Sequence, residues 1–233
     1  MIEQVDLIAF GAHPDDVEIG CGGLIASTLK RKMRVGIVDL TRGEMASTGT
    51  VEERAEEAAR AAEILGVTWR VNLGIPDRNV QINEVNLQEV VKVIRQGRPK
   101  VIVAPFWQDR HPDHVNCSRL VAEAFFSAGL WKFYPELKPY RPKRLFYYYL
   151  NHYHAKPSFV VDISPYFELK LRAIQAHHSQ FDENRLRTTG LNTGSFLEVL
   201  EARNRYFGSL IGVKYGEAFF SKEMLAVSNP LDL

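Results

Sequence analysis

The sequence predicts an α/β fold, a Rossmann-like three-layer sandwich around a mainly parallel β-sheet, in one domain that spans residues 1–233. Short apolar runs of strand length alternate along the chain with segments that have helical spacing of apolar residues. The runs are continuous, which favours strands that are covered on both faces. No repeat or linker divides the chain, and 233 residues suit a single large α/β domain.

The predicted strands come first in each repeating unit. Continuous apolar runs predict strands at 5–11, 34–40, a weaker one ending at Val71, and 101–104. Further along, where prolines and aromatic residues are dense, strands are predicted at 145–150 and 159–161. Short continuous runs of this kind are typical of the buried strands of parallel sheets.

A helical pattern follows each of the first four strands. Apolar residues at helical spacing predict helices around 24–29, 58–65 and 87–94, and a fourth that begins near Val115. Thr50 and Glu53 form a capping box that starts the second of these helices, and Gly66 ends it. Two later helices are predicted at 166–176 and 195–207. Strands that alternate with helices indicate βαβ units and therefore a parallel sheet.

Composition excludes several classes of partner. Apolar residues make up 45% of the chain and the formal net charge is +1, so we expect no nucleic-acid partner and no membrane partner. The N-terminal segment lacks a basic region and a secretory cleavage site, and no apolar stretch approaches the length of a membrane span. With only Cys21 and Cys117, no disulfide framework is expected, and a cytoplasmic protein is predicted.

Two similar motifs follow two of the predicted strands. His13-Pro14-Asp15-Asp16 comes directly after the first strand, and His111-Pro112-Asp113-His114 follows the fourth by a few residues. The carboxyl ends of parallel strands share one edge of a sheet, so motifs about 100 residues apart in the sequence can meet there. One such motif alone is more often a turn with a helix N-cap, but the pair favours a functional site.

The residue types suit a hydrolytic metal site. Catalytic zinc commonly has three protein ligands, often two histidines and a carboxylate, and one position open to water. His13, Asp16 and His114 supply that set. Asp15, whose side chain points differently from that of its neighbour, is the candidate general base.

The second motif also offers a catalytic imidazole. His111 is expected to stay free of metal and, as imidazolium, to stabilise an oxyanion or to protonate a leaving amine. Asp113 is expected to orient and charge His111, as carboxylates do for catalytic imidazoles elsewhere.

With this fold pattern, the two motifs resemble the LmbE-like (PIG-L) family of N-acetylglucosamine deacetylases. The resemblance implies zinc, or iron (Fe²⁺), bound by His13, Asp16 and His114, with Asp15 as base and His111 as oxyanion or acid group. It also implies a small-molecule N-acetylated sugar as substrate and a homo-oligomer.

The likeness is strongest to the bacillithiol-biosynthesis branch. Many family members have glutamate directly after the first motif, whereas this chain has Val17 and then Glu18, which is the form similar to this branch. Further segments similar to the branch are Asp39-Leu40-Thr41, Gly49-Thr50-Val51, Pro76-Asp77-Arg78, Asp109-Arg110 and Ser179-Gln180-Phe181. The branch implies N-acetylglucosaminyl malate as the substrate and acetate as a product.

Malate carries two carboxylates, which arginine recognises through its forked guanidinium. Arg54 and Arg110 are the candidates, because both lie near the predicted edge of the sheet. The alternative for Arg54 is a solvated pair with Glu57 on one helix face. No role is assigned to other polar residues of the loops and later helices: Glu44, Asp77, His152, His154, His177 and His178.

Three other functions stay open at this point. A phosphoester hydrolase often has two metals, whereas ligands for one are apparent. A nucleotide-binding protein would have Gly-x-Gly-x-x-Gly at the first turn, which reads Gly11-Ala12-His13-Pro14. A non-catalytic sugar-binding module would have no use for a base at Asp15.

Overall fold

The computed structural model describes residues 2–151, 156–181, 196–226 and 229. A seven-stranded sheet lies at its centre, in the order β3-β2-β1-β4-β5-β7-β6. Strands β1 to β5 are parallel, and β7 is antiparallel to both of its neighbours, β5 and β6. The predicted three-layer, mainly parallel α/β fold is confirmed.

The strands match the predicted apolar runs closely. Their bounds are β1 Leu7–Gly11, β2 Val35–Asp39, β3 Trp69–Asn72, β4 Val101–Pro105, β5 Arg144–Tyr148, β6 Phe159–Asp162 and β7 Gly216–Phe220. Every residue of β1 and β2 is buried, which explains why their sequences are apolar without alternation. No prediction was made for β7, which fills the position between β5 and β6.

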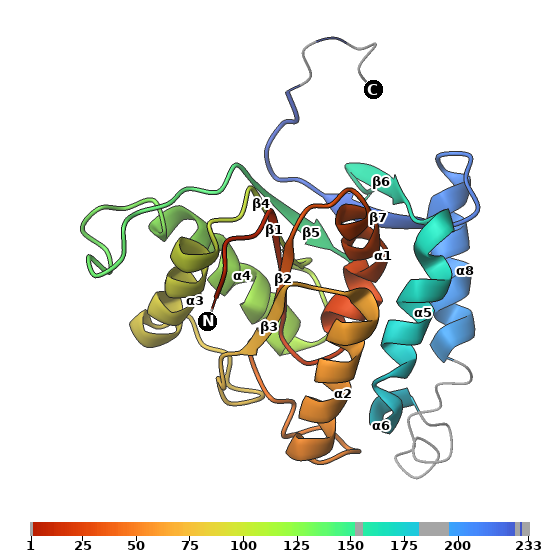
Figure 1. Ribbon diagram of the computed structural model, residues 1–233, viewed down its shortest axis with the longest axis horizontal. Helices are drawn as coiled ribbons and strands as arrows, with labels where there is room; N and C mark the ends of the chain where they lie inside the picture. Colours follow the sequence, from red (N-terminus) through yellow and green to blue (C-terminus); the bar gives the residue numbers. More distant parts are fainter. Residues whose placement is uncertain (1, 152–155, 182–195, 227–228, 230–233) are drawn as a thin grey trace.

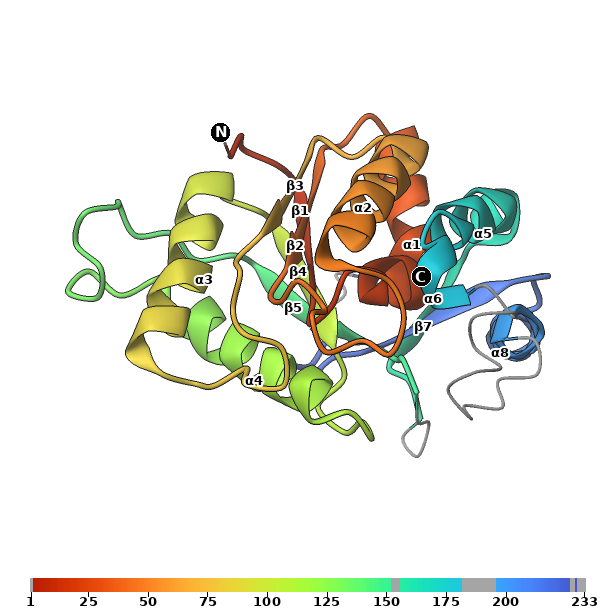
Figure 2. The same cartoon turned by 90° about the horizontal axis from the view of Figure 1, so that it is seen from below.

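Helices cover both faces of the sheet, as Figures 1 and 2 show. On one face lie α3 (Glu84–Gly97) and α4 (Pro112–Ser127), which pack on each other. On the other lie α1 (Asp16–Lys30), α2 (Val51–Leu65) and α5 (Phe167–Gln175), with the short α6 (His178–Phe181) at the end of α5. The last helix, α8 (Phe196–Ser209), packs on β7. A separate apolar core fills each interface between helices and sheet.

Local signals placed the helix ends well. The capping box of Thr50 and Glu53 is present at the start of α2, and Gly66 ends this helix in a left-handed conformation. Helix α1 is interrupted at Cys21, and its second half begins where Glu217 accepts the backbone N–H groups of Gly23 and Leu24. Among the described residues, no helix has the length and hydropathy needed to cross a membrane.

Candidate metal centre and active site

The two motifs lie side by side because their strands are neighbours. Strand β1 leads into the first motif and α1, and β4 is followed by the second motif at the start of α4. In the sheet β1 lies between β2 and β4, so the connections from β1 and β4 diverge to opposite faces. Ligands bind at such a point in open α/β sheets, outside the carboxyl ends of the strands.

Asp16 lies between the two predicted histidine ligands. Its Oδ1 is 3.2 Å from Nε2 of His114, and its Oδ2 is 3.5 Å from Nδ1 of His13. Oδ2 also accepts the backbone N–H groups of Ala12 and His13, both at 2.9 Å, which fixes the carboxylate in the loop. The structure thus brings together all three residues predicted to hold the ion.

Each imidazole has a carboxylate on its far side. Nε2 of His13 is 3.2 Å from Asp77 Oδ1 and 3.6 Å from Asp113 Oδ2. Nδ1 of His114 is 3.0 Å from Asp109 Oδ1, and Asp109 in turn accepts hydrogen bonds from the backbone and side-chain N–H groups of Asn151. Metal-binding histidines commonly donate their second ring N–H to a carboxylate in this way, which fixes the tautomer and the ring orientation.

The two distances from Asp16 to the histidines have the spacing of neighbouring ligands of one ion. Ligand atoms at 2.0–2.1 Å from a tetrahedral zinc lie about 3.3–3.4 Å from one another, close to the spacings around Asp16. Among the described residues, the groups whose ligand atoms all lie within 4.8 Å of one another are His13, His111 and His114, and His13, Asp77 and Asp113, so the predicted set with Asp16 is not one of them. In the set with Asp16, each histidine keeps a free ring nitrogen for the ion and a carboxylate for its other nitrogen.

The electrostatic environment favours a cation. Burial lowers the pKa of His13, but its hydrogen bonds with Asp113, Asp16 and Asp77 outweigh that effect and raise the pKa well above the ordinary value. Burial likewise opposes protonation of His114, yet Asp16 and Asp109 raise its pKa to about 9. Carboxylates that stabilise protons on these rings would also stabilise a metal ion between them.

Asp15 has an unusual backbone conformation. Its φ is 126°, in a region that residues with a side chain rarely adopt. Arg54 holds the preceding peptide, because its Nη2 donates to the carbonyl of Pro14 at 2.7 Å and lies 3.7 Å from Asp15 Oδ2. Burial raises the pKa of Asp15, and Arg54 partly opposes this rise. A raised pKa brings a carboxylate closer to the range in which a general base is effective.

His111 and Asp113 are related differently from the prediction. The backbone N–H of Asp113 donates to Nδ1 of His111 at 3.3 Å, so the proton of a neutral His111 is on Nε2. The Asp113 carboxylate instead accepts the backbone N–H of Arg78 at 2.6 Å and faces His13. Asp113 lies in the first turn of α4, directly after the N-cap region formed by His111. Burial lowers the pKa of His111.

Comparison with known proteins identifies the family. Residues 8–125, half of the chain, match the profile of PIG-L, described as GlcNAc-PI de-N-acetylase. A diacetylchitobiose deacetylase of Thermococcus kodakarensis is 34% identical over 88% of this chain and 78% of its own. The chain belongs to the PIG-L family.

Two further relatives of this PIG-L protein cover most of its length. A probable N-acetyl-alpha-D-glucosaminyl L-malate deacetylase 2 of Bacillus anthracis is 30% identical over 77% of this chain and 82% of its own. The crystal structure of a conserved protein of Thermus thermophilus has a TM-score of 0.87 and 42% identity, over 97% of this chain and 98% of the other.

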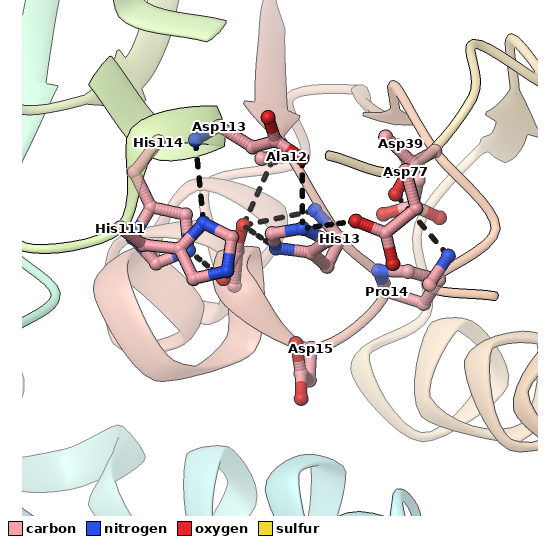
Figure 3. A network of polar contacts seen from close by, with 12 residues as sticks. Ala12, His13, Pro14, Asp15, Asp39, Asp77, His111, Asp113 and His114 are labelled. Carbon is pink, nitrogen blue, oxygen red and sulfur yellow. Dashed lines mark hydrogen bonds and ion pairs between the residues drawn. The ribbon is translucent and has the colours of Figure 1, made fainter. Parts of the chain in front are cut away.

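A pocket of about 340 Å³ opens above the histidines of the PIG-L protein. Asp15, Arg54, Arg110 and the three histidines line it, together with an apolar side formed by Ile19, Leu150, Phe181 and Phe196. Figure 3 shows the imidazoles of His13, His111 and His114 gathered on one side, with Asp15 set apart from them. The predicted site residues therefore line one cavity, with the exception of Asp113.

The two predicted arginines differ in their surroundings. Arg110 lines the pocket beside the second motif. Arg54 is buried, and its terminal nitrogens donate to the carbonyls of Pro14 and Gly43, so the alternative of a solvated pair with Glu57 is wrong. Its role in binding substrate stays a prediction.

Sequence reasoning missed two carboxylates that contact the central histidines. Asp77, which follows β3, contacts His13 and accepts the backbone N–H of Met45, and its own N–H donates to Glu44. Asp109, just before the second motif, contacts His114. Both residues follow strands of the same sheet, and that position was the signal that could have identified them.

The remaining histidines lie behind the site or outside the described residues. His177 is fully buried, with Nε2 3.6 Å from Glu18, which in turn pairs with Arg70 at 2.5 Å. The Arg70 guanidinium holds the pKa of Glu18 at about 2 in spite of burial. His178 contacts Glu57, and His152 and His154 are outside the described part of the chain.

Proposed function

We propose that this protein is a metal-dependent deacetylase that hydrolyses the acetamide of an N-acetylglucosamine derivative and releases acetate. The observation that carries the proposal is the position of Asp16, within 3.5 Å of ring nitrogens of both His13 and His114, at the base of a pocket that Asp15 and His111 also line. Membership of the PIG-L family supports the same reaction.

In this proposal His13, Asp16 and His114 hold a divalent cation, zinc or iron by resemblance to the family. When bound, the cation supplies Lewis acidity that lowers the pKa of water toward about 7 and polarises the acetamide carbonyl. Asp77 contacts Nε2 of His13 and Asp109 contacts Nδ1 of His114, so the second nitrogen of each ring faces Asp16. The ligands are therefore oriented before the cation binds.

The protein side chains move the protons. Asp15 accepts a proton from the attacking water as the water oxygen bonds to the acetamide carbon. The carbonyl electron pair moves to oxygen, and Nε2–H of His111 donates a hydrogen bond to this oxyanion. When the oxyanion collapses, the C–N bond breaks and the amine nitrogen takes up the proton that Asp15 had accepted. The products are acetate and a free glucosamine amine.

Two groups attached to the sugar have specific support. Malate is predicted from the resemblance to the bacillithiol branch, and Arg78 and Arg110 on the pocket lining suit its carboxylates. A second sugar is supported by the higher identity, 34%, to the diacetylchitobiose deacetylase.

Acetate release from N-acetylglucosaminyl malate, diacetylchitobiose and free N-acetylglucosamine tests both the proposed reaction and the proposed substrate. We expect acetate release from at least one of them, lost on chelation and restored by metal. If none of the three releases acetate, and the protein instead hydrolyses a phosphoester with a metal or binds sugar without hydrolysis, the proposed reaction is wrong.

Arg110→Gln separates the two substrates, with the exposed Arg119→Gln on α4 as the control. If malate is the natural group, Arg110→Gln raises KM for the malate conjugate by about 10-fold, the scale of a charge-assisted hydrogen bond, and leaves free N-acetylglucosamine unchanged. An equal effect on all substrates would discard malate recognition by Arg110.

A further inference from the structure

Two segments that the reaction does not use meet at the pocket. Gly49, in the loop before α2, has φ +79°, and a Cβ atom at this position would lie 2.6 Å from Oγ of Ser179 in α6. A side chain at residue 49 would therefore both strain the backbone and collide with Ser179. The loop and α6 are thus in close contact, although they are distant in the sequence.

Glu57 fixes α6 to α2. Its buried carboxylate accepts the backbone N–H and the Oγ–H of Ser179, both at 2.7 Å, and lies 2.8 Å from Nδ1 of His178. Figure 1 shows α6 beside α2, in agreement with these contacts. A buried carboxylate that accepts several hydrogen bonds is a strong local constraint, so α6 has one position relative to α2.

This arrangement fixes the amide of Gln180. Its Nε2 donates to the carbonyl of Thr48 at 2.8 Å and to Oγ of Ser179 at 2.9 Å. A backbone carbonyl can only accept, which settles which end of the amide is nitrogen. Oε1 remains as an acceptor with no hydrogen-bond donor among residues 2–151, 156–181, 196–226 and 229, and Gln180 lines the same pocket as Asp15 and His111.

We propose that Gln180 determines specificity for the sugar, by accepting a hydrogen bond from one sugar hydroxyl at its Oε1. This inference rests on the proposed deacetylase function and adds a residue that reads the sugar ring rather than the acetamide. Because Glu57 and Ser179 hold the amide in place, the hydrogen bond to substrate needs no reorganisation of the protein. Sites that hydrogen-bond a substrate hydroxyl reject analogues that lack it.

The test compares wild type with Gln180→Met, which has similar length and no hydrogen-bonding group at its end. The substrates are the N-acetylglucosamine derivative that wild type deacetylates and monodeoxy analogues that each lack one hydroxyl. We expect wild type to have a kcat/KM about 3- to 10-fold higher for the parent than for one analogue. Gln180→Met should lose this preference and keep the relative kcat/KM values of the other analogues. Gln175→Met on the exposed side of α5 is the matched control and should keep it.

Unfolding of wild type and Gln180→Met by urea is the second measurement, because it establishes that the variant compared with wild type is folded. The inference is overturned if wild type shows no preference for any hydroxyl, or if Gln180→Met lowers kcat/KM equally for the parent and every analogue. Inactivity of wild type toward every acetamide would instead refute the proposed function.

Discussion

Replacing Arg54 by methionine should separate a role in holding the catalytic loop from a role in binding substrate. Arg54 donates to the carbonyls of Pro14 at 2.7 Å and Gly43 at 3.1 Å, and both bonds are buried. A hydrogen bond to a charged group contributes about 1.5–3 kcal/mol, so loss of two should lower the free energy of unfolding by about 3–6 kcal/mol.

The effect on activity comes from Asp15. The strained backbone of Asp15, with φ 126°, costs about 1–3 kcal/mol and persists only while its surroundings hold it. Without Arg54 the peptide between Pro14 and Asp15 is free to relax, which moves the carboxylate. A displacement of about 1 Å can lower turnover about 100-fold, so Arg54→Met should lower kcat by at least that factor.

Three measurements on one preparation decide the matter: kcat and KM for acetate release, bound metal per chain, and unfolding by urea. Arg60→Met, on the exposed side of the same helix, is the control and should match wild type in all three. We expect Arg54→Met to keep the metal, to unfold at lower urea and to lose kcat. An increase in KM alone, with wild-type kcat and stability, would refute the loop-holding role and favour direct contact with substrate.

The other predictions concern the base, the metal and the core. Asp15→Asn should keep stoichiometric metal and lower kcat by about 10² or more, and full turnover in that variant would remove Asp15 as the base. Chelation should abolish acetate release and metal add-back should restore it, whereas unchanged activity in metal-free protein would exclude a metal-dependent reaction. Lys170→Met should cost about 3–5 kcal/mol of stability in urea, because it leaves buried Glu217 without its charged partner at 2.6 Å. Lys100→Met, which breaks the exposed pair with Asp6, should change stability far less, and an equal cost for both would contradict the argument from burial.

Features that depend on local sequence were predictable. The five buried residues of β1 and the capping box of Thr50 and Glu53 depend on residues that are neighbours in the sequence, so both can be predicted without knowledge of the fold. Strand β7 was missed because its place is set by pairing with β5 and β6, which are distant in the sequence. The short α6 likewise depends on contacts of Ser179 with Glu57 in α2.

The site shows the same division. The proximity of His13, Asp16 and His114 could be predicted because parallel strands end at one edge of the sheet, whatever the side-chain rotamers. The partner of Asp113 could not, since it depends on the direction of a side chain in the first turn of α4. Burial of Arg54 against two carbonyls also depends on how α2 packs on the loops, which the helix pattern alone does not reveal.

The central claim is that His13, Asp16 and His114 hold one ion and that His111 does not. Asp16→Ala and His111→Ala distinguish this set from the alternative set of three histidines. Metal content per chain, measured by elemental analysis after metal add-back and gel filtration, should be one for wild type and for His111→Ala, and close to zero for Asp16→Ala. Loss of the metal in His111→Ala, with full occupancy in Asp16→Ala, would contradict the proposed centre.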